Sequence, residues 1–314
     1  MPKHQKTDIP EKVVVSACLM GQNCKYNGEN NYNTTVAQIL SGSGFVCVCP
    51  EILGGLPCPR VPAEIVEGVV TTRDGRNVDK AFRDGAEKAL SIALENGATT
   101  AILQPRSPSC GVSEIYNGEF SGTLIPGSGI FASLLRKNGI RILNAFEIRK
   151  TTVQDLERVM QIYGFARDFM AMNGNPDQWG PTNWPPEELI ENDIERGCSY
   201  VCLYGRKIVG TFFYNFGEDI EPTYRIIEKG AWLDNGPYGV VHRIATDGSV
   251  KGVGTFCLMW AYSMCGHLRI DTHPDNCVMQ SLLEKCGFRQ CGVIHVEEDA
   301  FPRLAFEKTP QVVL

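Results

Sequence analysis

The first half of the chain alternates between short apolar runs and amphipathic segments. Continuous apolar runs rich in β-branched residues are typical of strands buried on both faces of a parallel sheet. The strands that this pattern predicts are residues 12–17, 44–48, 100–103 and 140–144, with an extended segment at 64–72. The helices that it predicts are residues 35–41, 78–95 and 131–137. Alternating strands and helices indicate a parallel α/β sheet with helices on its faces.

The pattern changes after residue 149. Two alternating polar and apolar runs around a tight turn, residues 199–204 and 208–214, predict a hairpin. Further predicted helices are residues 155–170, 255–265 and 276–286, and further predicted strands are 240–246, 267–271 and two after residue 288. The second half is therefore expected to be a mixed α/β domain.

Length changes the picture by requiring two domains. A chain of 314 residues exceeds one ordinary hydrophobic core, so domains are expected at residues 12–146 and 147–314. Residues 1–11 are polar with two prolines, which predicts a disordered tail rather than a signal peptide. No apolar run approaches the roughly 20 residues that span a bilayer. The sequence thus predicts a cytoplasmic protein with no membrane partner, and it does not indicate an oligomeric state.

Charge is spread unevenly along the chain. Residues 1–147 carry 14 Lys+Arg and 14 Asp+Glu, so the net charge of −6 arises from residues 148–314. Neither half has the basic surplus that binding to a phosphate backbone needs. Intact nucleic acid is therefore not an expected partner.

Three cysteines directly follow three predicted strands: Cys18, Cys49 and Cys110. Because the carboxyl ends of parallel strands meet at one edge of a sheet, these thiols are expected to converge there. Thirteen cysteines without a signal peptide argue against a disulfide framework. Cysteine is also a common core residue, so most of the thirteen are expected to be structural.

Histidine is absent between residues 12 and 144, so this domain lacks the commonest zinc ligand and the usual acid–base residue. Three soft thiolates suit an iron–sulfur cluster, and a cubane held by three cysteines leaves one iron open to substrate. A four-cysteine zinc site is the alternative, with Cys24 or Cys58 as the fourth ligand. Glu51 and Ser107 are the polar groups placed to act beside such a centre.

Several motifs in the first half resemble those of the DUF523 family, whose characterised members are thiouracil desulfidases. The likeness runs over residues 12–146. The motifs are residues 15–19 (VSACL), 26–28 (YNG), 49–51 (CPE), 54–60 (GGLPCPR), 106–111 (RSPSCG), 117–118 (NG) and 120–122 (FSG).

This resemblance implies a Rossmann-like domain that binds a [4Fe-4S] cluster through three cysteines. The implied cluster ligands are Cys18, Cys49 and Cys110. The implied catalytic residues are the carboxylate Glu51 and the serine Ser107. On the same basis Cys24 and Cys58 are expected to be bystanders.

A glycine-rich turn opens the helix predicted at residues 255–265. Such a turn is an anion cradle, because free backbone N–H groups and the helix dipole face the anion. Its order with the upstream strand, Asn276 and the Gly287-Phe288 pair resembles the GNAT acetyltransferases over residues 147–308. The resemblance implies that this domain binds acetyl-CoA. The implied cofactor-binding residues are Lys251, Gly252, Val253, Gly254 and Asn276.

Two positions depart from the GNAT pattern. Ser249 stands where Arg or Gln usually opens the turn, and Leu283 stands at the position of the usual tyrosine acid. The sequence therefore predicts acetyl-CoA binding with slow or acceptor-limited transfer. Of the histidines, His242 is expected to be packed in a strand, and His273, before a proline in a loop, is favoured as the functional one.

The resulting hypothesis is a desulfidase that removes sulfur from a small thiolated pyrimidine, converting thiouracil to uracil and releasing sulfide, with an appended acetyl-CoA-binding domain. One alternative is a GNAT N-acetyltransferase whose first half is a regulatory or substrate module. A third is a zinc-stabilised binding module with no reaction. Analysis of iron and acid-labile sulfide separates these three.

Overall fold

The structure is a computed structural model that describes residues 12–41, 44–296 and 301–310. The tail expected at residues 1–11 lies outside the described residues. The chain divides into two compact units, unit 1 (Met1–Ala145) and unit 2 (Phe146–Leu314). No helix in the described ranges is long and apolar enough to cross a membrane.

Unit 1 is built on a parallel sheet. Its strands are β1 (Lys12–Ser16), β2 (Phe45–Val48), β5 (Ala98–Leu103) and β8 (Arg141–Asn144), in the spatial order β2-β1-β5-β8. Every neighbouring pair is parallel. Val13, Val14 and Val15 of the central strand β1 are at most 3% exposed, as expected for a strand covered on both faces.

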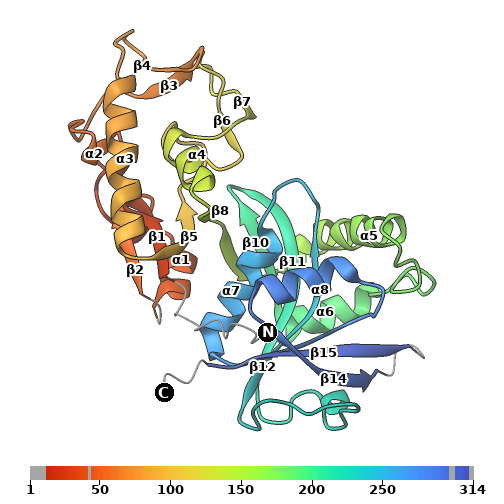
Figure 1. The fold of residues 1–314 in the computed structure, drawn as a ribbon. Helices are drawn as coiled ribbons and strands as arrows, with labels where there is room; N and C mark the ends of the chain where they lie inside the picture. Colours follow the sequence, from red (N-terminus) through yellow and green to blue (C-terminus); the bar gives the residue numbers. More distant parts are fainter. Residues whose placement is uncertain (1–11, 42–43, 297–300, 311–314) are drawn as a thin grey trace. The chain divides into compact units, whose positions relative to one another are not determined.

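Two helices, α3 (Asp79–Glu95) and α4 (Ile130–Lys137), pack against each other beside this sheet (Figure 1). Ala89 and Phe131 of these helices are fully buried in one core with Val14 and Leu103 of the strands. Between β1 and β2 the chain forms the 3-10 turn η1 (Ala17–Met20) and the helix α1 (Thr34–Leu40).

A short helix, α2 (Pro50–Leu53), lies against α3 through backbone contact. An added Cβ at Gly85 would lie 1.9 Å from the carbonyl oxygen of Pro50, and one at Gly54 would lie 2.0 Å from that of Ala81. Any larger residue at either position must move the backbone. This contact fixes where α2 lies as the chain leaves β2.

Two small hairpins complete unit 1, β3 (Ala63–Val66) with β4 (Val69–Thr72) and β6 (Glu114–Tyr116) with β7 (Leu124–Pro126). The buried carboxylate of Glu64 on β3 accepts hydrogen bonds from the backbone nitrogens of Gly118, at 2.9 Å, and Phe120, at 3.0 Å. These bonds tie the two hairpins together, and Figure 1 draws both at one end of the unit.

Unit 2 contains a seven-stranded mixed sheet. Its strands are β9 (Glu147–Lys150), β10 (Ser199–Tyr204), β11 (Lys207–Gly217), β12 (Tyr238–Thr246), β13 (Leu268–Thr272), β14 (Arg289–His295) and β15 (Pro302–Lys308), in the order β14-β15-β13-β12-β11-β10-β9. Strands β12 and β13 pair in parallel only at Gly239 with Leu268 and Val240 with Arg269. The two strands therefore separate after this point.

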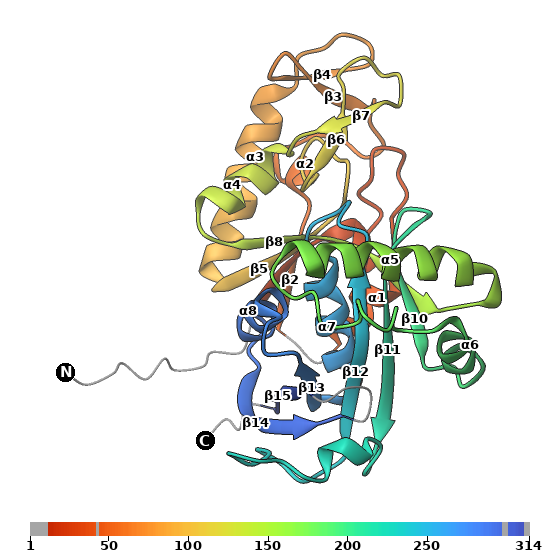
Figure 2. The ribbon, with the colours of Figure 1, turned by 90° about the vertical axis from the view of Figure 1, so that its right-hand side faces the viewer.

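Helices cover this sheet, and Figure 2 shows α5 and α7 beside β11 and β12. The helices of unit 2 are α5 (Leu156–Met172), α6 (Glu187–Glu195), α7 (Val253–Cys265) and α8 (Cys277–Lys285), with 3-10 turns η2 (Val153–Asp155) and η3 (Pro222–Tyr224). Apolar residues of α5 and α6, among them Tyr163 and Ile190, share a core with Val201 of β10 and Ala245 of β12.

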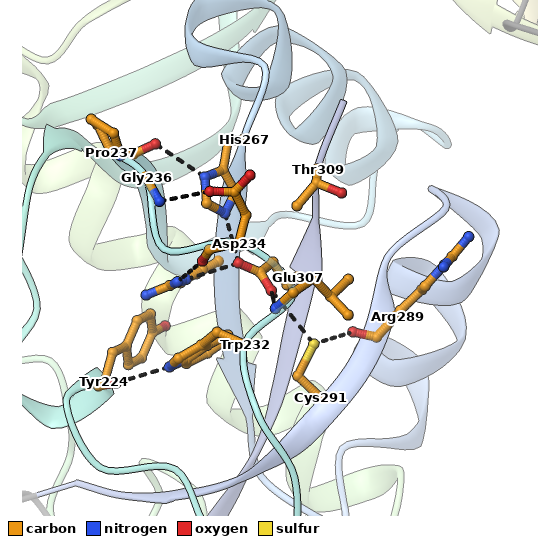
Figure 3. A network of polar contacts seen from close by, with 12 residues as sticks. Tyr224, Trp232, Asp234, Gly236, Pro237, His267, Arg289, Cys291, Glu307 and Thr309 are labelled. Carbon is orange, nitrogen blue, oxygen red and sulfur yellow. Dashed lines mark hydrogen bonds and ion pairs between the residues drawn. The ribbon is translucent and has the colours of Figure 1, made fainter. Parts of the chain in front are cut away.

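A buried polar network anchors the segment between β11 and β12 to the sheet (Figure 3). The Glu307 carboxylate is fully buried and lies 2.6 Å from His267 Nε2 and 3.0 Å from Arg269 Nε. It also accepts a hydrogen bond from the backbone nitrogen of Leu233. The Arg269 guanidinium lies 4.4 Å from the centre of the Trp232 ring. Buried charges with complete partners are typical of a structural anchor.

The predicted fold class is confirmed, with a parallel sheet in unit 1 and a mixed sheet in unit 2. The pattern did not predict α2, α6, β9 or the hairpin of β6 and β7. Helix α2 has four residues and β6 and β7 have three each, which is too short to show a period. The extended segment expected at 64–72 forms the hairpin of β3 and β4.

Candidate functional site

The carboxyl ends of β1, β2 and β5 lie at a cavity of about 790 Å³ in unit 1. Cys18 lies in η1 directly after β1, Cys49 lies between β2 and α2, and Cys110 lies in the loop after β5. Glu51 and Ser107 line the same cavity. The structure thus brings together the five residues that the sequence singled out in this unit.

The thiols of this cavity have raised pKa values. Burial raises the pKa of Cys110 well above its usual range, and the neighbouring Cys49 and Glu51 add to the shift. A hydrogen bond with Cys24, and then burial, raise the pKa of Cys49. Both thiols are protonated at neutral pH in the absence of a bound cation, so a metal that binds them must release their protons.

The two carboxylate oxygens of Glu51 have different partners. Oε2 pairs with the Arg60 guanidinium, 2.5 Å from Nη2 and 2.7 Å from Nε. Oε1 accepts a hydrogen bond from Ser107 Oγ at 3.5 Å. Arg60 also donates from Nη2 to the backbone oxygen of Cys24 at 2.9 Å, which holds the guanidinium in place. Arg60 therefore orients the carboxylate so that Oε1 is directed at Ser107.

The loop after β5 holds Ser107 in one orientation. Ser107 Oγ accepts hydrogen bonds from the backbone nitrogens of Ser109, at 3.1 Å, and Cys110, at 3.2 Å. The nitrogen of Gly111 donates to the Ser107 carbonyl oxygen at 2.8 Å, and an added Cβ at Gly111 would lie 2.8 Å from that oxygen. The backbone thus binds the lone pairs of Ser107 and leaves its hydrogen for Glu51.

Unit 2 has its own cavity of about 620 Å³, at the start of α7. Gly252 precedes this helix with φ 89°, a backbone conformation that glycine adopts readily. The first N–H groups of α7 have no partner within the helix, as at every helix start. The cavity is lined by all five predicted cofactor-binding residues, Lys251, Gly252, Val253, Gly254 and Asn276.

Comparison with known proteins places unit 1 in a family. A family model described as 2-thiouracil desulfurase matches residues 13–147. The uncharacterized protein YbbK of Bacillus subtilis is 39% identical over 146 residues, which are 43% of this chain and 97% of that protein. The chain belongs to the 2-thiouracil desulfurase family. This match confirms the resemblance that the motifs of residues 12–146 indicate.

Solved structures are similar to each half of this desulfurase-family chain. The [4Fe-4S]-dependent thiouracil desulfidase TudS is 42% identical, over 43% of this chain and 90% of its own, with a TM-score of 0.40. A GNAT-family acetyltransferase from Streptococcus agalactiae is 28% identical, over 53% of this chain and 96% of its own, with a TM-score of 0.49.

Two further cysteines near the desulfurase-family cavity differ in placement. Cys24 is 8% exposed and lines the cavity, and a hydrogen bond with Cys18 raises its pKa to about 11, although Cys49 opposes this shift. Cys58 is exposed, and its Sγ donates to two backbone carbonyls at 3.2 Å and 3.3 Å. Both were expected to be bystanders. The placement makes Cys24 a candidate ligand that experiments must separate from the predicted three.

The donor set of the cavity fits an iron–sulfur cluster by its chemistry. Four thiols line the cavity and no imidazole does, and thiolates are the usual ligands of such clusters. Within the described ranges, no three His, Cys, Asp or Glu side chains surround a point where a single metal ion could be held. Cys24 forms hydrogen bonds with Cys18 and with Cys49, so these thiols lie close together, as the ligands of one cluster must.

In unit 2 the two departures from the GNAT pattern have structural counterparts. Leu283 is fully buried, so the position of the usual tyrosine acid faces the core. Ser249 Oγ donates to Asp247 Oδ1 at 2.6 Å, which helps to order the turn before α7.

Sequence reasoning missed a polar cluster in the cavity of unit 2. His242 lines this cavity together with Glu221 and Asp271, whereas His273 is 1% exposed. The sequence led us to expect a functional His273 and a packed His242, but the structure places His242 at the cavity and buries His273. The available signal was the presence of ionisable residues, His242 and Asp271, within two predicted strands of the sheet, where partly buried ionisable groups need partners.

Proposed function

We propose that unit 1 is a [4Fe-4S]-dependent desulfidase that converts a thiolated pyrimidine, 2-thiouracil, to its oxo form and releases sulfide. The observation that carries this proposal is the convergence of Cys18, Cys49 and Cys110 with the hydrogen-bonded pair Glu51 and Ser107 in one cavity. The family membership and the likeness to TudS support the same reaction.

In this proposal the cluster is held by Cys18, Cys49 and Cys110. When bound, it would supply Lewis acidity that polarises the thiocarbonyl group. Cys24 provides the fourth thiol of the cavity. Its backbone oxygen accepts a hydrogen bond from Arg60, so this residue lies beside the proposed catalytic pair, Glu51 and Ser107.

Glu51 acts as the general base of the reaction. Its Oε1 takes a proton either from Ser107 or from a water held at the same place. Arg60 remains bound to Oε2, so the carboxylate keeps its orientation as the proton moves. The exchange balances as water plus the thiocarbonyl compound giving the carbonyl compound plus hydrogen sulfide.

The cavity walls suit a flat, uncharged heterocycle. Aromatic side chains of Tyr26, Tyr116 and Phe120 line the cavity, and such rings can stack on a pyrimidine. Arg73 and Arg76 line it as well and can donate to its oxygen atoms. The balanced charge of residues 1–147 favours a free pyrimidine over intact RNA.

The test is metal analysis and turnover on protein purified without oxygen. Wild type should contain iron and acid-labile sulfide and should release sulfide from 2-thiouracil. Cys18→Ala, Cys49→Ala and Cys110→Ala should each lose the iron, whereas the exposed control Cys58→Ala should keep it. If Cys24→Ala loses the iron and one of the other three retains it, the ligand set is wrong. Zinc in place of iron would reject the desulfidase proposal.

We further propose that unit 2 binds acetyl-CoA at the turn before α7. The positive φ of Gly252 and the start of a 13-residue helix at the cavity wall favour binding of the pyrophosphate. Lys251 adds a positive charge to the cavity. Calorimetry should detect acetyl-CoA binding to wild type and none to Gly252→Glu, with near-ultraviolet circular dichroism as the control for folding. If iron is absent while acetyl-CoA binds and is turned over, the alternative of an acetyltransferase with a regulatory first half is supported.

A further inference from the structure

The cavity of unit 2 contains a histidine held between two carboxylates. His242 Nε2 lies 2.9 Å from Glu221 Oε2, and His242 Nδ1 lies 3.6 Å from Asp271 Oδ1. The side chains of all three are between 11% and 22% exposed, and all three line the cavity. The cluster is therefore shielded from bulk water but open to a ligand.

The strands place this cluster at the point where the sheet opens. β12 and β13 are last paired at Val240 and Arg269. His242 and Asp271 each lie two residues beyond that pair, so both side chains point to the same side of the two separating strands. The turn that would bind pyrophosphate begins after Thr246, four residues further along β12.

Hydrogen bonding decides which nitrogen of His242 is available. The Glu221 carboxylate accepts from Nε2, and it also accepts from the backbone nitrogen and the hydroxyl of Thr223. Burial alone would raise the pKa of Glu221, but His242 and Thr223 lower it to about 2, so Glu221 is ionised at neutral pH. Because a carboxylate only accepts, the Nε2 that faces Glu221 carries a proton, and in an imidazole with one proton Nδ1 is left as the acceptor. Nδ1 is then a base that faces the cavity.

Asp271 supplies the second acceptor. Its Oδ1 accepts a hydrogen bond from the buried Tyr224 hydroxyl at 2.8 Å, and the distance of 3.6 Å to His242 Nδ1 exceeds a hydrogen bond. Two acceptors that face each other in this way are suited to a donor that lies between them, such as an ammonium group.

The other charged groups around His242 are already engaged. They are Arg243, which pairs with Asp193 at 2.5 Å, and Arg303, whose Nε lies 4.0 Å from Asp271 Oδ2. The Phe213 ring packs beside the imidazole, with 5.8 Å between ring centres.

We propose that this cluster binds the primary ammonium group of an acyl acceptor and that His242 Nδ1 accepts its proton. The inference rests on the proposed acetyl-CoA binding by unit 2. The ammonium loses one proton to Nδ1, and the amine nitrogen forms a bond to the thioester carbonyl carbon. The carbon–sulfur bond breaks with its electron pair on sulfur, and the second nitrogen proton passes to that sulfur. His242 then releases its proton to water.

His242 therefore acts as the base in a domain in which leucine, at position 283, stands in place of the usual tyrosine acid. Glu221 is a positioning residue, because it acts through the imidazole, and Asp271 binds the ammonium. The acceptor class is a compact primary amine, since the ammonium must reach a cluster whose side chains are at most 22% exposed.

The first test needs no acyl donor. In the intact protein with His242 assigned by NMR, n-butylamine should shift the His242 ring signals in a saturable way, whereas the uncharged isostere n-butanol should not. Asp271→Asn should weaken amine binding at least tenfold. The signals of exposed His295 are the internal control. Equal responses to amine and alcohol, or no saturable response, would overturn the proposed site.

The second test measures transfer. His242→Gln should lower kcat for acetylation of n-butylamine about 10²–10⁴-fold, while the acetyl-CoA Kd stays within twofold. The matched control His295→Gln should match wild type. A rate for His242→Gln within threefold of wild type would reject the base role. If wild type binds no acetyl-CoA, the cofactor proposal fails, and the amine titration decides the present inference alone.

Discussion

At the scale of single residues, the two oxygens of the Glu51 carboxylate have different partners. Arg60 is bound to Oε2 of Glu51 and Ser107 to Oε1, so the oxygen that orients the group differs from the one that we propose as the base. The backbone nitrogens of Ser109 and Cys110 fix Ser107 in turn. We therefore expect Glu51 and Ser107 to be needed for turnover but not for binding of the cluster.

Glu51→Gln and Ser107→Ala are expected to retain the cluster and lose turnover. A general base typically contributes about 10²–10⁴-fold, so sulfide release should fall by that range while the iron content and visible absorption remain. The measurement is sulfide release per bound cluster. A loss below tenfold in Glu51→Gln would remove this residue from the role of base.

Glu307 is expected to be a major source of stability in unit 2. Glu307→Ala leaves His267 and Arg269 buried without their acceptor, which should cost about 3–5 kcal/mol in the free energy of unfolding. The control is Glu228→Ala, because Glu228 meets His295 on the surface with both side chains more than half exposed. That variant should change the free energy of unfolding by less than about 1 kcal/mol. Equal effects in denaturant unfolding of unit 2 would contradict the assignment.

The same carboxylate makes unit 2 sensitive to acid. Burial alone would raise the pKa of Glu307, but hydrogen bonds from His267, Leu233 and Arg269 lower it below its ordinary value of 4.5. A lowered pKa in the folded state stabilises the fold above the ordinary value, and the gain is lost as pH falls through the folded-state value. The difference in stability between wild type and Glu307→Gln should therefore shrink as pH is lowered below about 4.5.

The candidate residues of unit 1 could be predicted because strand ends are visible in the sequence. Cys18, Cys49 and Cys110 each follow an apolar run, and parallel topology brings such positions to one edge. Cys24 and Cys58 were both named as a possible fourth ligand, and the sequence could not decide between them, because their placement depends on irregular segments of the chain. His242 was missed because its partner Glu221 lies in a connection with no periodic pattern.

At the scale of elements, α2 is positioned by its contact with α3. Four residues are too few for a helix to be stable by itself. Gly54 and Gly85 let the two backbones meet, and Glu51 lies on the helix that this contact holds. The helical spacing of apolar residues predicted α3. A contact between backbones leaves no such pattern in the sequence, so α2 could not be predicted.

Two helical glycines should respond oppositely to alanine. Gly85→Ala would place its Cβ 1.9 Å from the Pro50 carbonyl oxygen, which should destabilise unit 1 by about 1–3 kcal/mol and lower sulfide release. Gly164→Ala in α5 meets only a side-chain atom of Arg167 at 3.8 Å, and should stabilise unit 2 by up to about 1 kcal/mol. Calorimetry of thermal unfolding measures both. A neutral Gly85→Ala would show that α2 can move at no cost.

At the scale of the whole molecule, the two units carry separate cavities and different charge. The cavity lined by thiols belongs to residues 16–122 and the other to residues 165–303, and only the second half is acidic overall. The net charge of each unit therefore affects which charged substrates it attracts.

Salt should have little effect on desulfidation of free 2-thiouracil. An uncharged substrate and a charge-balanced unit release few counterions, so kcat/KM should change less than twofold between about 50 and 200 mM salt. Thiouridine-containing transfer RNA is the comparison. Turnover of that RNA with a loss of about 10³–10⁵-fold over the same range would show phosphate contacts and contradict the proposed substrate.

Gly252→Glu should separate the two units. The variant should lose acetyl-CoA binding because the glutamate adds bulk and negative charge at the pyrophosphate site, and its sulfide release from 2-thiouracil should equal that of wild type. Calorimetry and sulfide assays on the same preparation give both values. Lower sulfide release with the fold intact would mean that the state of unit 2 affects the reaction in unit 1.

The contact of Gly54 and Gly85 bears on how the substrate range of the cavity can change. The proposed base Glu51 lies on a helix that main-chain contact holds in place, whereas Tyr26, Tyr116 and Phe120 line the cavity with side chains. Replacing the aromatic residues alters the room for a ring substituent without moving the carboxylate. A library confined to those three positions should therefore yield desulfidases for bulkier thioheterocycles that retain the chemistry of the parent, while mutations at either glycine should be lost from any active pool.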